Sequence, residues 1–232
     1  MITLLLLTAG ISYVVVSYKT PPTMDISTLH DLTDKLLVQP KANDLLNLYD
    51  FTGENKWNGA SFRFSNLTDV SYNHASAVHI DKAHNWLSNE PEREKTILKF
   101  QNEVSNIVAQ STKDSIGKEH SAIYLPIAME LERLSYSKAE KRILIIYSDL
   151  MENDLDLTLY SKNELQLLKT NPDSLKEVFE KRKTLPSLVG IDVYLIYQPE
   201  DAEADGEYRI ISAFYRRMLE EKGAMVHIAA NL

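Results

Sequence analysis

The chain contains no cysteine, and that absence alone excludes several kinds of chemistry. Without cysteine there can be no disulfide, no thiolate-bound zinc, no cysteine nucleophile and no lipidated cysteine. The cellular compartment stays open, because a protein without disulfides can reside on either side of a bacterial membrane.

The sequence also lacks a dense run of lysine and arginine, and its formal net charge is −8. A chain of this charge repels phosphate backbones over most of its surface, which argues against a nucleic-acid partner. Neither glycine-rich phosphate-binding pattern occurs, whether G-x-x-x-x-G-K-[ST] or G-x-G-x-x-G. The composition itself, 44% hydrophobic and 25% charged, is ordinary for a globular protein with a sizeable core.

Residues 2–18 carry no charge and are mostly apolar. As a helix rising about 1.5 Å per residue, such a segment just reaches across the hydrocarbon core of a bilayer. A cleaved signal peptide normally has a basic start and a small-x-small cleavage site. Here no Lys or Arg precedes the apolar run, and Ser17-Tyr18-Lys19 would be a poor cleavage site. We predict that residues 1–19 anchor the protein to a membrane. An uncleaved signal-like segment of a secreted or periplasmic protein, and a buried first strand, are the alternatives.

Residues 20–23, Thr-Pro-Pro-Thr, form a stiff break that we predict to be a linker. Residues 24–232 are predicted to form one domain, because the sequence shows no internal repeat. In its first part, leucines at helical spacing predict a helix over residues 29–37, and an apolar run predicts a strand over residues 45–49.

The rest of the chain alternates between strand and helix patterns. Further strands are predicted at residues 60–64, 75–80, 143–147, 193–197 and 225–229. Helices are predicted from Asn89, from near Ser121, and over residues 162–183 and 208–222. Such alternation predicts a three-layer α/β fold, with a mostly parallel central sheet and helices on both faces.

Polar side chains stand where two of the predicted strands end, and a third group precedes a helix. Asp50 and Thr52 follow the first predicted strand, Ser148 and Asp149 follow the strand at residues 143–147, and Ser121 lies just before a helix. In an open parallel sheet, ligands bind beyond the carboxyl ends of the strands, near the point where strand order reverses. We therefore expect these groups to converge there.

This order of motifs resembles the von Willebrand factor A family and its metal-ion-dependent adhesion site. The family pattern is a strand ending in Asp-x-Ser-x-Ser, a loop hydroxyl that opens a helix, and a strand ending in Ser/Thr-Asp. By that resemblance the implied metal ligands are Asp50, Thr52, Glu54, Ser121 and Asp149. Glu54 replaces the second serine of the pattern. The sequence departs again at residues 53–59, which lead towards a hairpin where the family has a helix.

The implied function is a protein-binding module, tethered to a membrane, that recruits a partner protein through a divalent cation. Carboxylates and hydroxyls suit Mg²⁺, or Mn²⁺ or Ca²⁺, and the family uses a vacant coordination position to grip a partner's carboxylate. Two alternatives use the same residues. One is a metal-dependent hydrolase or phosphotransfer enzyme, with His120 as its candidate base. The other is a metal-free scaffold, in which Asp50 and Asp149 merely cap loops or helices.

A run of acidic residues lies near the carboxyl end of the predicted strand at 193–197. Its members are Glu200, Asp201, Glu203, Asp205 and Glu207. We predict a solvated loop here, on the same edge as Asp149. If such a loop had a binding role, it would attract cations or a basic partner.

Overall fold

A computed structural model describes residues 21–33, 35–68, 74–84, 89–112, 121–154 and 157–232. Its strands are β1 (Thr23–Asp31), β2 (Gly59–Leu67), β3 (Ala75–Ile80), β4 (Lys141–Tyr147), β5 (Ile191–Ile196) and β6 (Met225–Ala229). They form one sheet in the order β3-β2-β1-β4-β5-β6. All neighbours are parallel except β2 and β3. The predicted mostly parallel sheet is confirmed.

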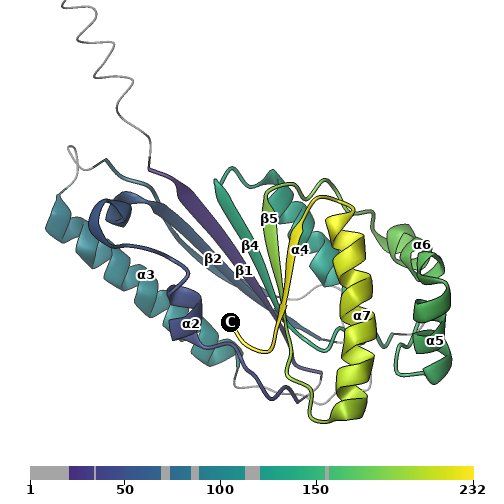
Figure 1. The fold of residues 1–232 in the computed structure, drawn as a ribbon. Coiled ribbons are helices and arrows are strands. Elements are labelled where there is room, and N and C mark those ends of the chain that lie inside the picture. The colour runs from purple at the N-terminus through teal and green to yellow at the C-terminus, as the bar shows by residue number, and fades with distance from the viewer. Residues whose placement is uncertain (1–20, 34, 69–73, 85–88, 113–120, 155–156) are drawn as a thin grey trace, which may run out of the picture.

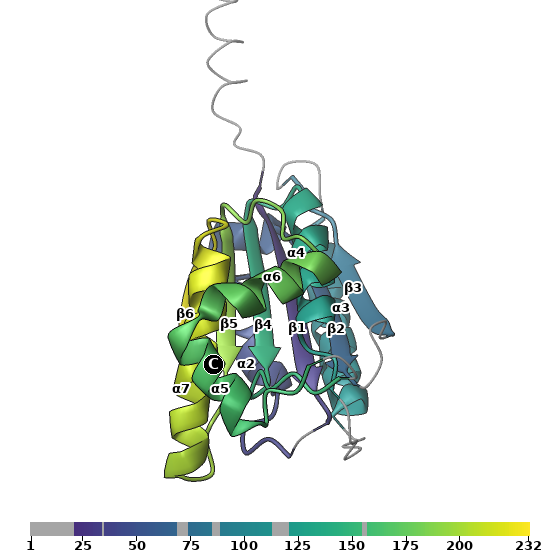
Figure 2. The same cartoon turned by 90° about the vertical axis from the view of Figure 1, so that its right-hand side faces the viewer.

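Helices cover both faces of the sheet, as Figures 1 and 2 show. On one face lie α2 (Ala42–Leu46), the 3₁₀ turn η1 (Gly53–Trp57) and α3 (Glu90–Ser111). The other face carries α4 (Tyr124–Tyr136), α5 (Lys162–Thr170), α6 (Pro172–Arg182) and α7 (Ala202–Glu220). Each face has its own buried apolar cluster, so the three-layer α/β fold expected from the sequence is confirmed.

The first part of the chain was predicted wrongly. Residues 29–31, where a helix was expected to begin, are the end of strand β1 (Thr23–Asp31). Residues 45–46, where a strand was expected to begin, are the end of helix α2 (Ala42–Leu46). The cause lies in the composition of β1, which buries Asp25, Ser27, Thr28 and His30. A strand with so many polar side chains does not show the continuous apolar pattern typical of a central parallel strand.

Two further corrections concern helix boundaries. The predicted helix at 162–183 is two helices that meet at Asn171, because Pro172 disfavours helical backbone at the residue before it. The predicted acidic loop is mostly the start of α7. There the Asp201 side chain accepts a hydrogen bond from Ala204 N–H (2.9 Å), and acidic residues favour the positive end of the helix dipole.

Strand order reverses between β1 and β4. The chain runs from β1 outward to β2 on one side and from β4 outward to β5 and β6 on the other. His30 pairs with Tyr147, so Asp31 lies beside Ser148 at the carboxyl ends of these two strands. This is the switch point at which open α/β sheets bind ligands.

No helix among the described residues is long and apolar enough to cross a membrane. The segment at residues 2–18, for which an anchor was predicted, lies outside the described residues. The anchor stays a prediction.

Candidate functional site at the switch point

A buried aspartate, Asp31, lies at the switch point and accepts hydrogen bonds from Thr33 and Ser148. Its Oδ1 accepts hydrogen bonds from the Thr33 backbone N–H (2.9 Å) and the Thr33 hydroxyl (2.6 Å). Its Oδ2 accepts one from the hydroxyl of Ser148 (2.7 Å). All three residues are buried, and these bonds tie the end of β1 to the end of β4 across the point where strand order reverses.

The chain turns sharply after Ser148. The Ser148 oxygen accepts a hydrogen bond from Leu150 N–H (2.9 Å), and Asp149 Oδ1 accepts one from Met151 N–H (2.9 Å). Leu150 adopts φ of 66°, a left-handed conformation that is unfavourable for a residue with a branched side chain. Such backbone strain persists only where surrounding contacts hold it, and it gathers at functional sites.

Ser121, the predicted loop hydroxyl, lies beside this turn. Its backbone pairs with Asn153 in both directions, at 2.8 and 3.0 Å, and its hydroxyl donates to the Met151 carbonyl (3.0 Å). The structure therefore places Ser121 beside the segment that follows Asp149.

A second buried carboxylate, Glu152, fixes the next helix. Its Oε2 accepts hydrogen bonds from the N–H groups of Ile123 (3.0 Å) and Tyr124 (2.7 Å) at the start of α4, and its Oε1 contacts Arg182 (2.8 Å). Burial raises the pKa of Glu152 to about 7, although the two N–H groups and the guanidinium favour the charged form. Arg182 also binds Asp154 (2.5 Å) and so links α6 to this loop.

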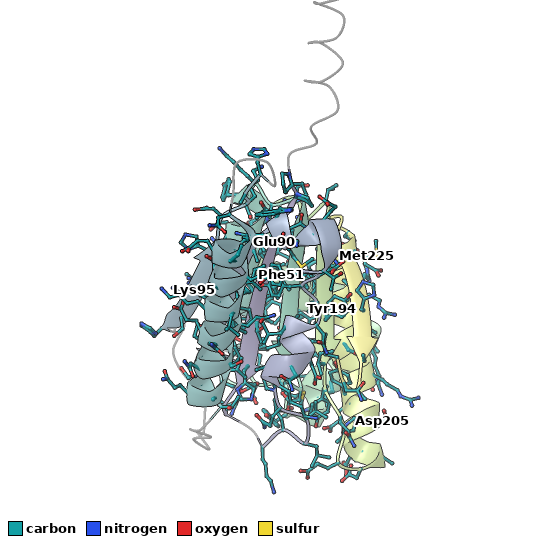
Figure 3. The ribbon with its side chains drawn as sticks, turned by 90° about the vertical axis from the view of Figure 1, so that its left-hand side faces the viewer. Phe51, Glu90, Lys95, Tyr194, Asp205 and Met225 are labelled. Atoms are coloured by element: carbon teal, nitrogen blue, oxygen red, sulfur yellow. The ribbon has the colours of Figure 1, made fainter. Side chains whose placement is uncertain are left out.

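The other three predicted ligands lie at the opposite edge of the sheet. Asp50 lines a 170 Å³ cavity with Thr23 and Lys141, the first residues of β1 and β4. Because β4 is seven residues long, about 20 Å separates this edge from Asp149. In Figure 3, Phe51, the neighbour of Asp50 in the chain, lies nearer the end where β6 begins, and Asp205 lies at the other end.

The Asp50 carboxylate accepts its hydrogen bonds from residues that follow it closely in the chain. Asp50 accepts from the Thr52 backbone (2.9 Å), the Thr52 hydroxyl (2.7 Å) and the Asn55 amide. These bonds, above all that from the Thr52 hydroxyl, lower the pKa of Asp50. Glu54 lies in the 3₁₀ turn that follows. The structure thus does not bring Asp50, Thr52 and Glu54 together with Ser121 and Asp149.

Sequence reasoning missed Asp31 and Thr33. The tripeptide Asp31-Leu32-Thr33 has the same Asp-x-Thr form as Asp50-Phe51-Thr52, so the signal was present. It was passed over because residues 29–37 were assigned to a helix, which removed the strand end that the pattern requires. His120, the candidate base of the enzyme alternative, lies outside the described residues.

The oxygen groups at the switch point are of the kind that hard divalent cations prefer. The hydroxyls of Thr33 and Ser121 donate to Asp31 and Met151 but keep lone pairs, and Asp149 adds a carboxylate. Within the described residues, no group of three or more His, Cys, Asp or Glu side chains is placed to hold a metal. A cation here would therefore depend on hydroxyl ligands as well as carboxylates.

No family model matches the sequence, and no curated protein matches it. Solved structures that align with most of the chain include an aerotolerance-related membrane protein from Bacteroides fragilis NCTC 9343. Its TM-score is 0.36 at 13% identity, over 89% of this chain and 92% of that one. A conserved hypothetical protein, BatB, from Bacteroides thetaiotaomicron aligns with a TM-score of 0.37 at 11% identity, over 90% of this chain and 91% of that one. Similarity at this level supports no functional argument.

Proposed function

We propose that the chain is a von Willebrand A-like protein-binding module whose switch-point edge contacts a partner protein. One observation carries the proposal: the hydrogen bond between Ser148 and Asp31 joins an Asp-x-Thr motif to a Ser-Asp motif at the switch point. That is the order of motifs expected from the family resemblance, with Asp31 and Thr33 in the positions first given to Asp50 and Thr52.

A divalent cation, Mg²⁺ or its substitutes Mn²⁺ and Ca²⁺, is part of this proposal. Asp149 and the hydroxyls of Thr33 and Ser121 would hold it, and Asp31 would orient Thr33 by accepting its proton. When bound, the cation supplies a positive charge that can accept a partner's carboxylate. The buried hydrogen bonds of Asp31 hold Thr33 and Ser148 in place before any partner arrives.

Membrane tethering through residues 2–18 fits the geometry of the sheet. β1 begins at Thr23, at the amino edge, and its nine residues span about 30 Å to Asp31. An anchor that precedes Thr23 would therefore join the domain at the edge opposite the switch point. The candidate site would then face away from the bilayer, where a partner can reach it.

The cation is tested by thermal unfolding of the full chain with and without Mg²⁺. A cation that binds only the folded state at a hundredfold excess over its dissociation constant adds about 2.7 kcal/mol. For a domain of this size that is a rise in Tm of about 5–11 °C. Asp149→Asn should abolish the rise. The matched control Asp50→Asn changes a carboxylate at the opposite edge and should keep it.

A Tm that does not respond to millimolar Mg²⁺ or Mn²⁺ would remove the cation from the proposal. An equal loss of the response in Asp50→Asn would indicate diffuse binding to the acidic surface. The tether is tested separately: the full chain should stay with membranes after a carbonate wash, and a chain that begins at Pro21 should not. Release of the full chain by the wash would contradict the anchor.

A further inference from the structure

A groove of 870 Å³ runs between helix α7 and the edge strand β6. Figures 1 and 2 show these two elements side by side at the margin of the fold. Apolar residues from both elements and from the end of β5 line the groove, among them Tyr197, Ala213 and Ile228. A cavity of this volume is in the range of specific ligand sites.

The outer edge of the strand beside the groove is unpaired in the described part of the chain. Among the described strands, β6 pairs with β5 and with no other. The Ala229 carbonyl accepts a hydrogen bond from Tyr197 N–H (3.2 Å), so the backbone groups of Ala229 point towards β5. Backbone groups of successive strand residues point to opposite sides, so those of Val226 and Ile228 face outward. A free edge of this kind is a template for another strand.

The side of α7 that borders the groove carries positively and negatively charged side chains. Arg209 pairs with Asp205 at 2.8 Å, but Arg216 approaches Glu220 only to 3.9 Å. Arg216 Nε is buried and makes no hydrogen bond to any described residue. Arg216 is thus less closely paired than Arg209, and a carboxylate is the acceptor that binds a guanidinium most strongly.

We propose that this groove binds an extended segment of a partner protein, which adds to β6 as a further strand. Its backbone would pair with Val226 and Ile228. Alternate side chains would be apolar and lie against Tyr197 and Ala213, and one carboxylate would meet Arg216. Main-chain hydrogen bonds supply the affinity in such strand addition, and pockets for alternate side chains supply the specificity. The proposal does not depend on a cation at Asp149.

A second copy of the chain is a poorer occupant. Two antiparallel copies of α7 centred on Ser212 and Ala213 would oppose Arg209 to Arg216 and Asp205 to Glu220. Each pair has like charge, which is unfavourable at an interface. The groove is therefore better suited to a foreign strand than to self-association along α7.

The test is a displayed library of peptides of about ten residues, long enough to form one strand, selected on the full chain in detergent. The peptides alternate apolar residues with randomised polar ones. We expect recovered peptides to contain a carboxylate and to bind at least about tenfold more weakly to Ala213→Trp, which fills the groove. Ile228→Pro, which removes an outward N–H on an edge strand that tolerates proline, should weaken binding similarly.

The matched control is Leu98→Trp, which adds the same side chain at an exposed position of α3 on the other face. It should leave peptide binding unchanged, and the Tm of each variant shows that the domain remains folded. Recovered peptides that bind Ala213→Trp as tightly as the parent would overturn the proposal, and so would a selection that recovers none. A dimer that Ala213→Trp dissociates would overturn it in favour of a second copy.

Discussion

The hydrogen bonds of Ser148 allow a prediction of stability at the candidate site. Ser148 is fully buried, and its hydroxyl donates to Asp31 and accepts from Leu150 N–H. Ser148→Ala removes both bonds but leaves Asp31 and the Leu150 N–H buried. A lost hydrogen bond that leaves a buried group behind costs about 1–3 kcal/mol, so we expect a loss of about 2–4 kcal/mol in the free energy of unfolding.

Thermal and urea unfolding of the full chain would measure this loss. In a domain of this size 1 kcal/mol corresponds to about 2–4 °C, so the expected decrease in Tm is about 4–16 °C. The urea concentration at the unfolding midpoint should fall. The slope of the free energy of unfolding against urea concentration should stay the same, because the surface exposed on unfolding hardly changes.

Ser212→Ala is the matched control. Ser212 is also buried, but it lies within α7 and makes no side-chain hydrogen bond to a described residue. Because alanine is a better helix former than serine, this variant should be neutral or slightly stabilised. Equal effects of the two substitutions would refute the view that Ser148 holds the two strand ends together.

Two further predictions concern buried charges. Arg133→Ala should cost about 3–5 kcal/mol in urea unfolding, because it takes the guanidinium away from the buried carboxylates of Asp25 and Glu130, whereas Arg209→Ala on the surface should cost less than about 1 kcal/mol. Because the pKa of Glu152 is raised to about 7 from an ordinary value near 4.5, the folded state holds more protons than the unfolded state between these values. The free energy of unfolding should then fall as pH rises through that window, by about 2–4 kcal/mol, and Glu152→Gln should flatten this dependence; an unchanged slope would contradict it.

The later strands could be predicted because their composition matches their position. Residues 143–147 are an uninterrupted apolar run, and all are buried in the centre of the sheet. The strands at 193–197 and 225–229 were placed within two residues of their observed limits. In β4, burial on both faces demands apolar residues, so local pattern and tertiary position agree.

The first strand could not be predicted, because its polar residues are satisfied by partners distant in sequence. Asp25 binds Arg133 and Ser137, and the Ser27 hydroxyl donates to Glu130 at 2.6 Å. Each of these partners lies more than a hundred residues away, so no window of sequence shows them. The error carried over to the site, since the strand that delivers Asp31 was not recognised.

The same buried charges explain how the site is held in position. Arg133, near the end of α4, is fixed to β1 by two bonds of 3.0 Å to Asp25, and the start of α4 is fixed by Glu152. Helix α4 is thereby anchored at both ends, to the first strand and to the loop after β4. Ser121 lies three residues before α4, so these contacts also set its place beside Met151. Glu152 thus holds the end of α4 that lies next to Ser121, and the Asp25–Arg133 pair that hides β1 in the sequence holds the other end of the same helix.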